Sequence, residues 1–313
     1  MLVIDNLTKR YGKFLAVSGL SLEIPRGDIF GFVGPNGAGK TTTMKIVAGL
    51  MQPTSGRVLI DGVDLSKNIK EIRGKIGYMP DFFGVYDDLK VDEYLDFYCA
   101  AYGIASYQRK KIIDDLLELV DLSDKRDAYV DSLSRGMKQR LCLARSLVHD
   151  PLLLILDEPA SGLDPRARVE MKEILKELKK MGKTILISSH ILPELAELCT
   201  SIGIIEKGKM IVSGSVDEIM LQSHGTRTFR VKVLGDEDTA IRIIQEQPMV
   251  DGIIRNTDNI EVGFKGSDEQ ASLMLHELIK NDVHVVFFGE VQRNLEDVFM
   301  RITEGVLQDE NKN

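Results

Sequence analysis

The chain has 313 residues, 43% hydrophobic and 28% charged, which is the composition of a globular protein with room for two domains. No stretch approaches the roughly 18–20 consecutive apolar residues of a membrane-spanning helix, and the N-terminus lacks an export signal, which favours a cytoplasmic location. Of the net charge of −8, residues 222–313 carry −7, with ten basic and 17 acidic side chains. This excess argues against nucleic-acid binding there, and a solvated acidic face accounts for it without a partner.

The larger, N-terminal part of the chain alternates β-prone and helical segments, which predicts an α/β fold with a largely parallel sheet. Residues 28–34 form a β-prone run that leads into a glycine-rich turn and a predicted helix over 40–50. Residues 151–157 and 184–188 are continuous apolar runs, as expected for strands buried on both faces. The amphipathic segment 166–181 joins them as a βαβ unit.

Three successive helical patterns without strands indicate a helical subdomain at about residues 82–148 within a first domain of residues 1–221. These helices are predicted at 91–102, 107–120 and 135–148.

A second domain is predicted over residues 222–305, followed by a flexible tail at 306–313. Its elements have the order strand, helix, strand, strand, helix, strand, which is that of an α+β ferredoxin-like domain, and one more helix follows. The strands are predicted at 228–234, 250–255, 260–264 and 283–288, and the helices at 238–247, 268–280 and 295–303.

A phosphate-binding loop is predicted between the strand at 28–34 and the helix at 40–50. Residues 34–41 (GPNGAGKT) match G-x-x-x-x-G-K-[ST] in full. Glycines let backbone N–H groups converge on phosphate oxygens, Lys40 would reach the β- and γ-phosphates, and the Thr41 hydroxyl would ligate Mg²⁺. The predicted nucleotide contacts here are Gly34, Pro35, Asn36, Gly37, Ala38, Gly39, Lys40, Thr41 and Thr42.

Two adjacent carboxylates, Asp157 and Glu158, end the predicted strand at 151–157, where ligands bind in open α/β sheets. Asp157 would hold Mg²⁺, and Glu158 would orient and deprotonate the attacking water. Acidic residues also end strands as solvated turn starters, but the pairing with Lys40 and Thr41 favours catalysis. These residues predict a P-loop nucleoside triphosphatase, a class that includes kinases, helicases and GTPases.

Further segments resemble, in the same order along the chain, the ATP-binding subunits of ABC transporters. Leu133 to Arg140 (LSRGMKQR) resembles the LSGGQ-type signature, and residues 159–165 (PASGLDP) resemble the D-loop. His190 resembles the switch histidine, and Tyr11 the aromatic residue that stacks on adenine. The resemblance implies a RecA-like α/β core with a helical subdomain.

The resemblance also implies roles for individual residues. Ser134 and Gly136 would cap the γ-phosphate bound by a second subunit, so that two chains face each other head to tail around two ATP sites. His190 would contact the γ-phosphate and help to hold the attacking water, and Asp164 would contact nucleotide. Tyr11 would stack on the purine, unless it packs as an ordinary strand aromatic.

Three positions depart from the family's pattern. Arg135 replaces the second glycine of the signature, Met137 replaces its glutamine, and Asp81 stands where the Q-loop has glutamine. Ser134 and Gly136 remain, so phosphate capping is expected to be retained. An ionised aspartate only accepts hydrogen bonds and has a shorter side chain, so Asp81 is either a catalytic residue near the metal or a turn residue.

Nine of the 19 aromatic residues fall within residues 78–107, where the resemblance implies a groove for a helix of the membrane subunit. Most of them could instead pack the helical subdomain, with Phe82, Phe83 and Tyr86 as candidates for partner contact. Residues 294–299 (NLEDVF) resemble the end of ATPases from bacterial drug, antibiotic and sodium exporters, in which the extra domain supports dimer contacts.

The resemblance therefore predicts an ATP-hydrolysing subunit that uses ATP and Mg²⁺, pairs with a second ATPase subunit and powers an integral membrane permease, with export favoured. It would lie peripherally on the inner face of the cell membrane. The alternative is a soluble ABC ATPase acting on ribosomes or DNA, which usually has two nucleotide domains or long coiled coils. A regulator without turnover is disfavoured by Glu158 and His190.

Overall fold

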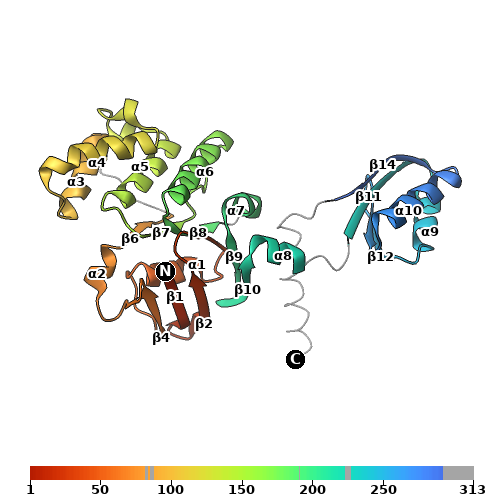
Figure 1. The fold of residues 1–313 in the computed structure, drawn as a ribbon, viewed down its shortest axis with the longest axis horizontal. Coiled ribbons are helices and arrows are strands. Elements are labelled where there is room, and N and C mark those ends of the chain that lie inside the picture. The colour runs from red at the N-terminus through yellow and green to blue at the C-terminus, as the bar shows by residue number, and fades with distance from the viewer. Residues whose placement is uncertain (82–83, 85–87, 190, 223–226, 292–313) are drawn as a thin grey trace. The chain divides into compact units, whose positions relative to one another are not determined.

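The computed structural model describes residues 1–81, 84, 88–189, 191–222 and 227–291 (Figure 1). His190, the aromatic residues Phe82, Phe83 and Tyr86, and the predicted helix and tail beyond residue 291 lie outside this part of the chain. The chain forms two compact units, Met1–Val216 and Asp217–Asn313.

The central sheet of the first unit has the strand order β10-β9-β3-β8-β7-β6, parallel except for β10. Its middle strands β3, β8 and β7 are buried along their whole length, which confirms the interpretation of the continuous apolar runs. The strands are β3 (Ile29–Val33), β6 (Ile76–Met79), β7 (Leu153–Asp157), β8 (Thr184–Ser189), β9 (Ser201–Glu206) and β10 (Lys209–Ser215).

Helices connect these strands as predicted, since α1 follows β3 and α6 joins β7 to β8 as a βαβ unit. The helix α6 begins at Pro165, where Asp164 caps it by accepting a hydrogen bond from the Ala167 N–H group. The core helices are α1 (Lys40–Val47), α2 (Ile69–Arg73), α6 (Pro165–Lys180) and α7 (Leu192–Leu198).

A second, antiparallel sheet of order β2-β1-β4-β5 is absent from the sequence prediction. It shares one hydrophobic core with α1 and the central sheet, around Leu20, Phe32, Met44 and Ile60. The Ser18 N–H group donates to the Gly208 carbonyl at 2.8 Å and ties β2 to the turn between β9 and β10. The strands are β1 (Leu2–Tyr11), β2 (Phe14–Ile24), β4 (Ser55–Ile60) and β5 (Val63–Asp64).

The helical subdomain contains the three predicted helices, α3 (Val91–Ala101), α4 (Ser106–Leu119) and α5 (Arg135–Leu147). Figure 1 shows them together at one end of the first unit, away from the antiparallel sheet. The buried Arg140 of α5 donates to the carbonyls of Val120 and Asp121 at 2.9 and 3.1 Å. The orientation of α5 is thereby fixed against the C-terminal end of α4.

The second unit has a four-stranded antiparallel sheet of order β12-β13-β11-β14. Because β13 lies between β11 and β12, and β11 between β13 and β14, both βαβ units are split, as in a ferredoxin-like fold. Val231, Val262, Ile244 and Met274 are among the core residues between sheet and helices. After α8 (Val216–Gln222), the elements are β11 (Arg227–Leu234), α9 (Glu237–Gln245), β12 (Val250–Arg255), β13 (Ile260–Phe264), α10 (Asp268–Lys280) and β14 (His284–Glu290).

Candidate nucleotide-binding and hydrolysis site

The glycine-rich loop between β3 and α1 is held so closely that two positions require glycine. A β-carbon at Gly34 would lie 2.3 Å from the Ile205 carbonyl oxygen, and one at Gly39 would lie 2.6 Å from that of Ala16. Gly39 also has a left-handed backbone, with φ of 108°. The loop therefore packs against β9 and β2 while the start of α1 stays open to a ligand.

Lys40, the first residue of α1, is buried and turns its ammonium group back onto the loop. Its Nζ donates to the Gly34 and Pro35 carbonyls at 2.6 and 3.3 Å. Desolvation lowers the pKa of Lys40, against the opposing effect of the charges on Glu158 and Asp157. A buried cation on a loop of backbone N–H groups is suited to a polyphosphate.

The Asp157 carboxylate and the backbone of Glu158 are joined by a residue that the sequence interpretation missed, Ser188 of β8. The Ser188 hydroxyl donates to Asp157 Oδ1 at 2.7 Å and accepts from the Glu158 N–H group at 2.9 Å. Asp157 Oδ2 is buried and, within the described part of the chain, has no hydrogen-bond partner. An orphaned carboxylate oxygen beside a phosphate loop fits a Mg²⁺ ligand.

A hollow of about 400 Å³ brings the phosphate loop together with Tyr11, Asp81 and Glu158. Tyr11 is 45% exposed, and its hydroxyl donates to Met51 Sδ at 2.9 Å, so its ring stands at the surface of β1 and not in a core. Three lining residues were not predicted, namely Phe14, which is a second exposed aromatic, Ala16 and Ser161. The volume is that of a small-molecule site. It is lined by Tyr11, Phe14, Ala16, Asn36, Gly37, Ala38, Gly39, Lys40, Thr41, Thr42, Asp81, Glu158 and Ser161.

The signature residues lie in a different hollow, of about 360 Å³, which shares no lining residue with the first. Ser134 caps α5 by accepting from the Met137 N–H group at 3.3 Å, and Asp164 caps α6 in the same hollow. Gly136 lets the two helices approach, because its β-carbon would lie 3.0 Å from that of Ala167. The structure thus gathers Ser134, Gly136 and Asp164, but not with the phosphate loop.

Arg135, a departure from the signature pattern, contacts the segment that resembles the D-loop. Its Nη2 donates to the Ser161 carbonyl at 3.0 Å, and Gln139 Nε2 donates to the same oxygen at 3.2 Å. The Arg135 guanidinium also lies against Gly162, where a β-carbon would approach it to 2.4 Å. The substitution therefore adds a link between α5 and residues 161–162.

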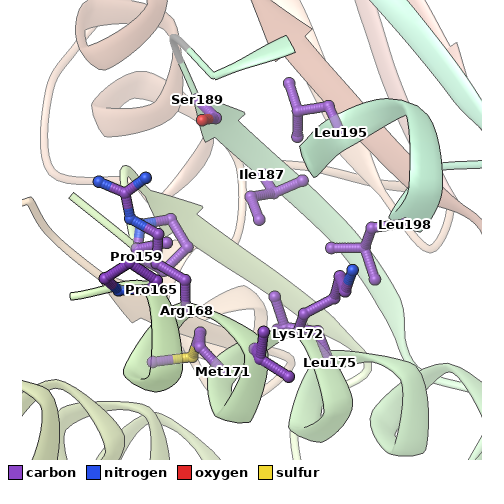
Figure 2. Close-up of a pocket in the computed structure, with 12 residues that line it drawn as sticks. Pro159, Pro165, Arg168, Met171, Lys172, Leu175, Ile187, Ser189, Leu195 and Leu198 are labelled. Atoms are coloured by element: carbon purple, nitrogen blue, oxygen red, sulfur yellow. The ribbon is translucent and has the colours of Figure 1, made fainter. Parts of the chain in front are cut away.

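A third hollow, of about 220 Å³, lies between α6, α7 and β8 (Figure 2). Figure 2 shows the apolar side chains of Met171, Leu175, Ile187 and Leu195 around it. Of its two cations, Arg168 and Lys172, the second is paired with Glu197. This lining does not suit a triphosphate, and the glycine-rich loop is not part of it.

The phosphate loop, the buried lysine and the carboxylates on the neighbouring strand define a P-loop nucleoside triphosphatase. A family model described as ABC transporter matches residues 17–161. The chain is 30% identical over 311 residues to the linearmycin resistance ATP-binding protein LnrL of Bacillus subtilis (strain 168), covering 99% of this chain and 100% of that protein. It is 36% identical over 301 residues to the bacitracin transport ATP-binding protein BcrA of Bacillus licheniformis, covering 96% of each. The chain therefore belongs to the family of ABC transporter ATP-binding proteins.

Solved structures support the same assignment. An ATP-binding subunit of an ABC transporter matches with a TM-score of 0.65 and 31% identity, covering 71% of this chain and 93% of that one. A dimeric ATP-binding cassette, MJ0796, in a post-hydrolysis state with ADP and phosphate, matches with a TM-score of 0.63 and 25% identity, covering 69% and 99%. The chain is thus an ATPase that uses ATP and Mg²⁺. None of its described helices is long and apolar enough to cross a membrane.

Proposed function

We propose that this chain drives an export permease, a separate membrane protein, by closing and reopening an ATP-bound dimer. The supporting observation is the separation of the phosphate-loop hollow from the signature hollow within one chain. A second chain arranged head to tail would place its Ser134 helix end over the phosphates of the first. Export is supported by relatives named for linearmycin resistance and Nod factor export.

In the proposed site, Lys40 and the loop N–H groups bind the phosphates, and Tyr11 stacks on the base. Thr41 and Asp157 would hold Mg²⁺, which would neutralise phosphate charge. Glu158 takes the proton of the attacking water.

The remaining site residues complete the proposed dimer. Ser134, Gly136 and Asp164 act on the nucleotide of the partner subunit. His190 supports the attacking water. Asp81 shares the nucleotide hollow with Glu158, which favours its assignment to the site over an ordinary turn residue.

The permease is proposed to bind a hollow of about 290 Å³ formed by β6, α3 and α5. Its lining is aromatic and cationic, and the Arg145 guanidinium lies 5.3 Å from the centroid of the Tyr98 ring. Tyr102 is 46% exposed and stacks on His149 at a centroid distance of 3.8 Å. Exposed aromatic residues with arginine are typical of interface centres. Binding there would hold the chain on the inner face of the membrane.

Domain roles follow the same proposal. Residues 1–221 form the ATPase domain, with the helical subdomain at about 82–148 carrying the permease contact. The ferredoxin-like domain at 222–305 supports dimer contacts, and residues 306–313 form the tail.

The test uses the full-length chain reconstituted in vesicles with the membrane protein encoded by the neighbouring reading frame. We expect co-purification and stimulated ATP hydrolysis. Tyr102→Ala should abolish most of the stimulation and leave basal hydrolysis unchanged. The control is Tyr107→Ala, which removes an aromatic side chain that is 83% exposed and lies outside this hollow; it should change neither activity. Co-purification with ribosomes or DNA, or equal stimulation of both variants, would contradict the proposal.

A further inference from the structure

We propose that Ser188 is a positioning residue that sets both catalytic carboxylates, a hypothesis that rests on the proposed roles of Asp157 and Glu158. Ser188 is fully buried near the C-terminal end of β8. In the parallel pairing of β7 with β8, it lies opposite Asp157. Its hydroxyl is therefore placed by the sheet, not by a loop.

The hydroxyl determines which oxygen of Asp157 remains available to a metal ion. A serine hydroxyl can donate only one hydrogen bond, and Ser188 donates it to Asp157 Oδ1 at 2.7 Å. This fixes the carboxylate plane and leaves Oδ2 as the oxygen without a hydrogen-bond partner among the described residues. Groups that orient a metal ligand in this way tune metal affinity without touching the metal.

The same oxygen atom holds the backbone of Glu158. The Glu158 N–H group donates to Ser188 Oγ at 2.9 Å, and Glu158 has a left-handed backbone with φ of 52°. Among the described non-glycine residues with positive φ, most are asparagine or aspartate, which tolerate this conformation; glutamate does not share that preference. Strained backbone at a functional site persists where its surroundings hold it, and the hydrogen bond to Ser188 is such a constraint.

A purely structural hydroxyl would affect stability alone, so the control is a second buried hydroxyl on the same strand. Thr184 lies at the other end of β8, and its Oγ1 accepts from the Gly27 N–H group at 2.9 Å. Thr184→Val removes one buried hydroxyl and leaves one backbone donor unpaired, as Ser188→Ala does, but away from the carboxylates.

The experiment measures Mn²⁺ binding by electron paramagnetic resonance, in the full-length chain with a non-hydrolysable ATP analogue, and the Mg²⁺ dependence of ATP hydrolysis. We expect Ser188→Ala to weaken Mn²⁺ binding and lower kcat about 10- to 100-fold each. Binding of the analogue without metal, which depends on the loop, should change less than about twofold. Ser188→Thr, which keeps the hydroxyl, should restore most of both values.

Unchanged Mn²⁺ binding in Ser188→Ala, or an equal loss in Thr184→Val, would overturn the proposal. If Ser188→Ala does not fold, Ser188→Cys takes its place, because a thiol has a similar size but is a weak hydrogen-bond donor. Mn²⁺ binding in Ser188→Cys equal to that in Ser188→Thr would also overturn the proposal. These measurements use the chain without a permease, so failure of the transport function leaves them interpretable.

Discussion

The left-handed backbone of Glu158 predicts a measurable conflict between stability and activity. Glu158→Gln and Glu158→Gly both remove the carboxylate, so each should lose the factor of about 10²–10⁴ in turnover that a positioned base contributes. That factor corresponds to about 2.7–5.4 kcal/mol of activation free energy. The ATP-loaded glutamine variant should accumulate as a dimer, detectable by size-exclusion chromatography.

The two variants should differ in stability, because only glycine escapes the steric cost of the φ of 52°. That cost is about 1–2 kcal/mol for a residue with a β-carbon. Glycine also makes the unfolded chain more flexible, which lowers the free energy of unfolding by about 0.4–1 kcal/mol and offsets part of this gain. The net gain of about 1 kcal/mol corresponds to a melting temperature about 2–4 °C higher for a unit of this size.

Calorimetry of the nucleotide-free proteins measures the difference, and comparing two variants that both lack the charge cancels its electrostatic effect. Lys207→Gly is the matched control, because Lys207 also has a positive φ, of 46°, in the turn between β9 and β10. It should melt higher than the wild type and retain turnover. A Glu158→Gly protein that melts at or below the temperature of Glu158→Gln would refute the strain argument.

Other expectations follow from buried contacts. Gly39→Ala should weaken ATP binding more than tenfold by calorimetry, since its β-carbon would lie 2.6 Å from the Ala16 carbonyl oxygen. Arg140→Met should lower the urea-unfolding free energy by about 1–3 kcal/mol, because it leaves the buried Val120 carbonyl without the Arg140 donor. Burial lowers the pKa of His149 below 6.5, so the unfolded chain takes up a proton first and stability falls as pH drops below about 6.5. His149→Phe should reduce that loss; unfolding curves with identical pH dependence would contradict it.

Periodic and continuous apolar patterns were sufficient to predict most elements. The buried strands β7 and β8 are runs of apolar residues, and the helices α9 and α10 are amphipathic, so the predicted bounds of these four elements agree with the structure within two residues. The antiparallel sheet was missed for a physical reason. The pairing of β1 with β2 shifts register three times, which breaks the alternation that identifies a half-buried strand.

The candidate site was predictable where one short segment carries its chemistry, as in residues 34–41. Ser188 was not, because its significance lies in pairing with Asp157 across two parallel strands, and a serine near a strand end is unremarkable by itself. Ser161 was missed for the same reason, since its place in the nucleotide hollow depends on how the segment after β7 folds back. A motif search detects local patterns, whereas these two positions are defined by register and by chain reversal.

Ser161 connects the nucleotide hollow to the helix that begins at the signature residues. Ser161 lines the nucleotide hollow, and its carbonyl oxygen accepts hydrogen bonds from Arg135 and Gln139 of the signature helix α5. If nucleotide displaces residue 161, the displacement must either break both hydrogen bonds or carry the start of α5 with it. Because α5 is in turn held to α4 through Arg140, the second outcome would move the signature and the helical subdomain as one body. The arginine that departs from the family's signature therefore adds a hydrogen bond between the signature helix and a segment that lines the nucleotide hollow.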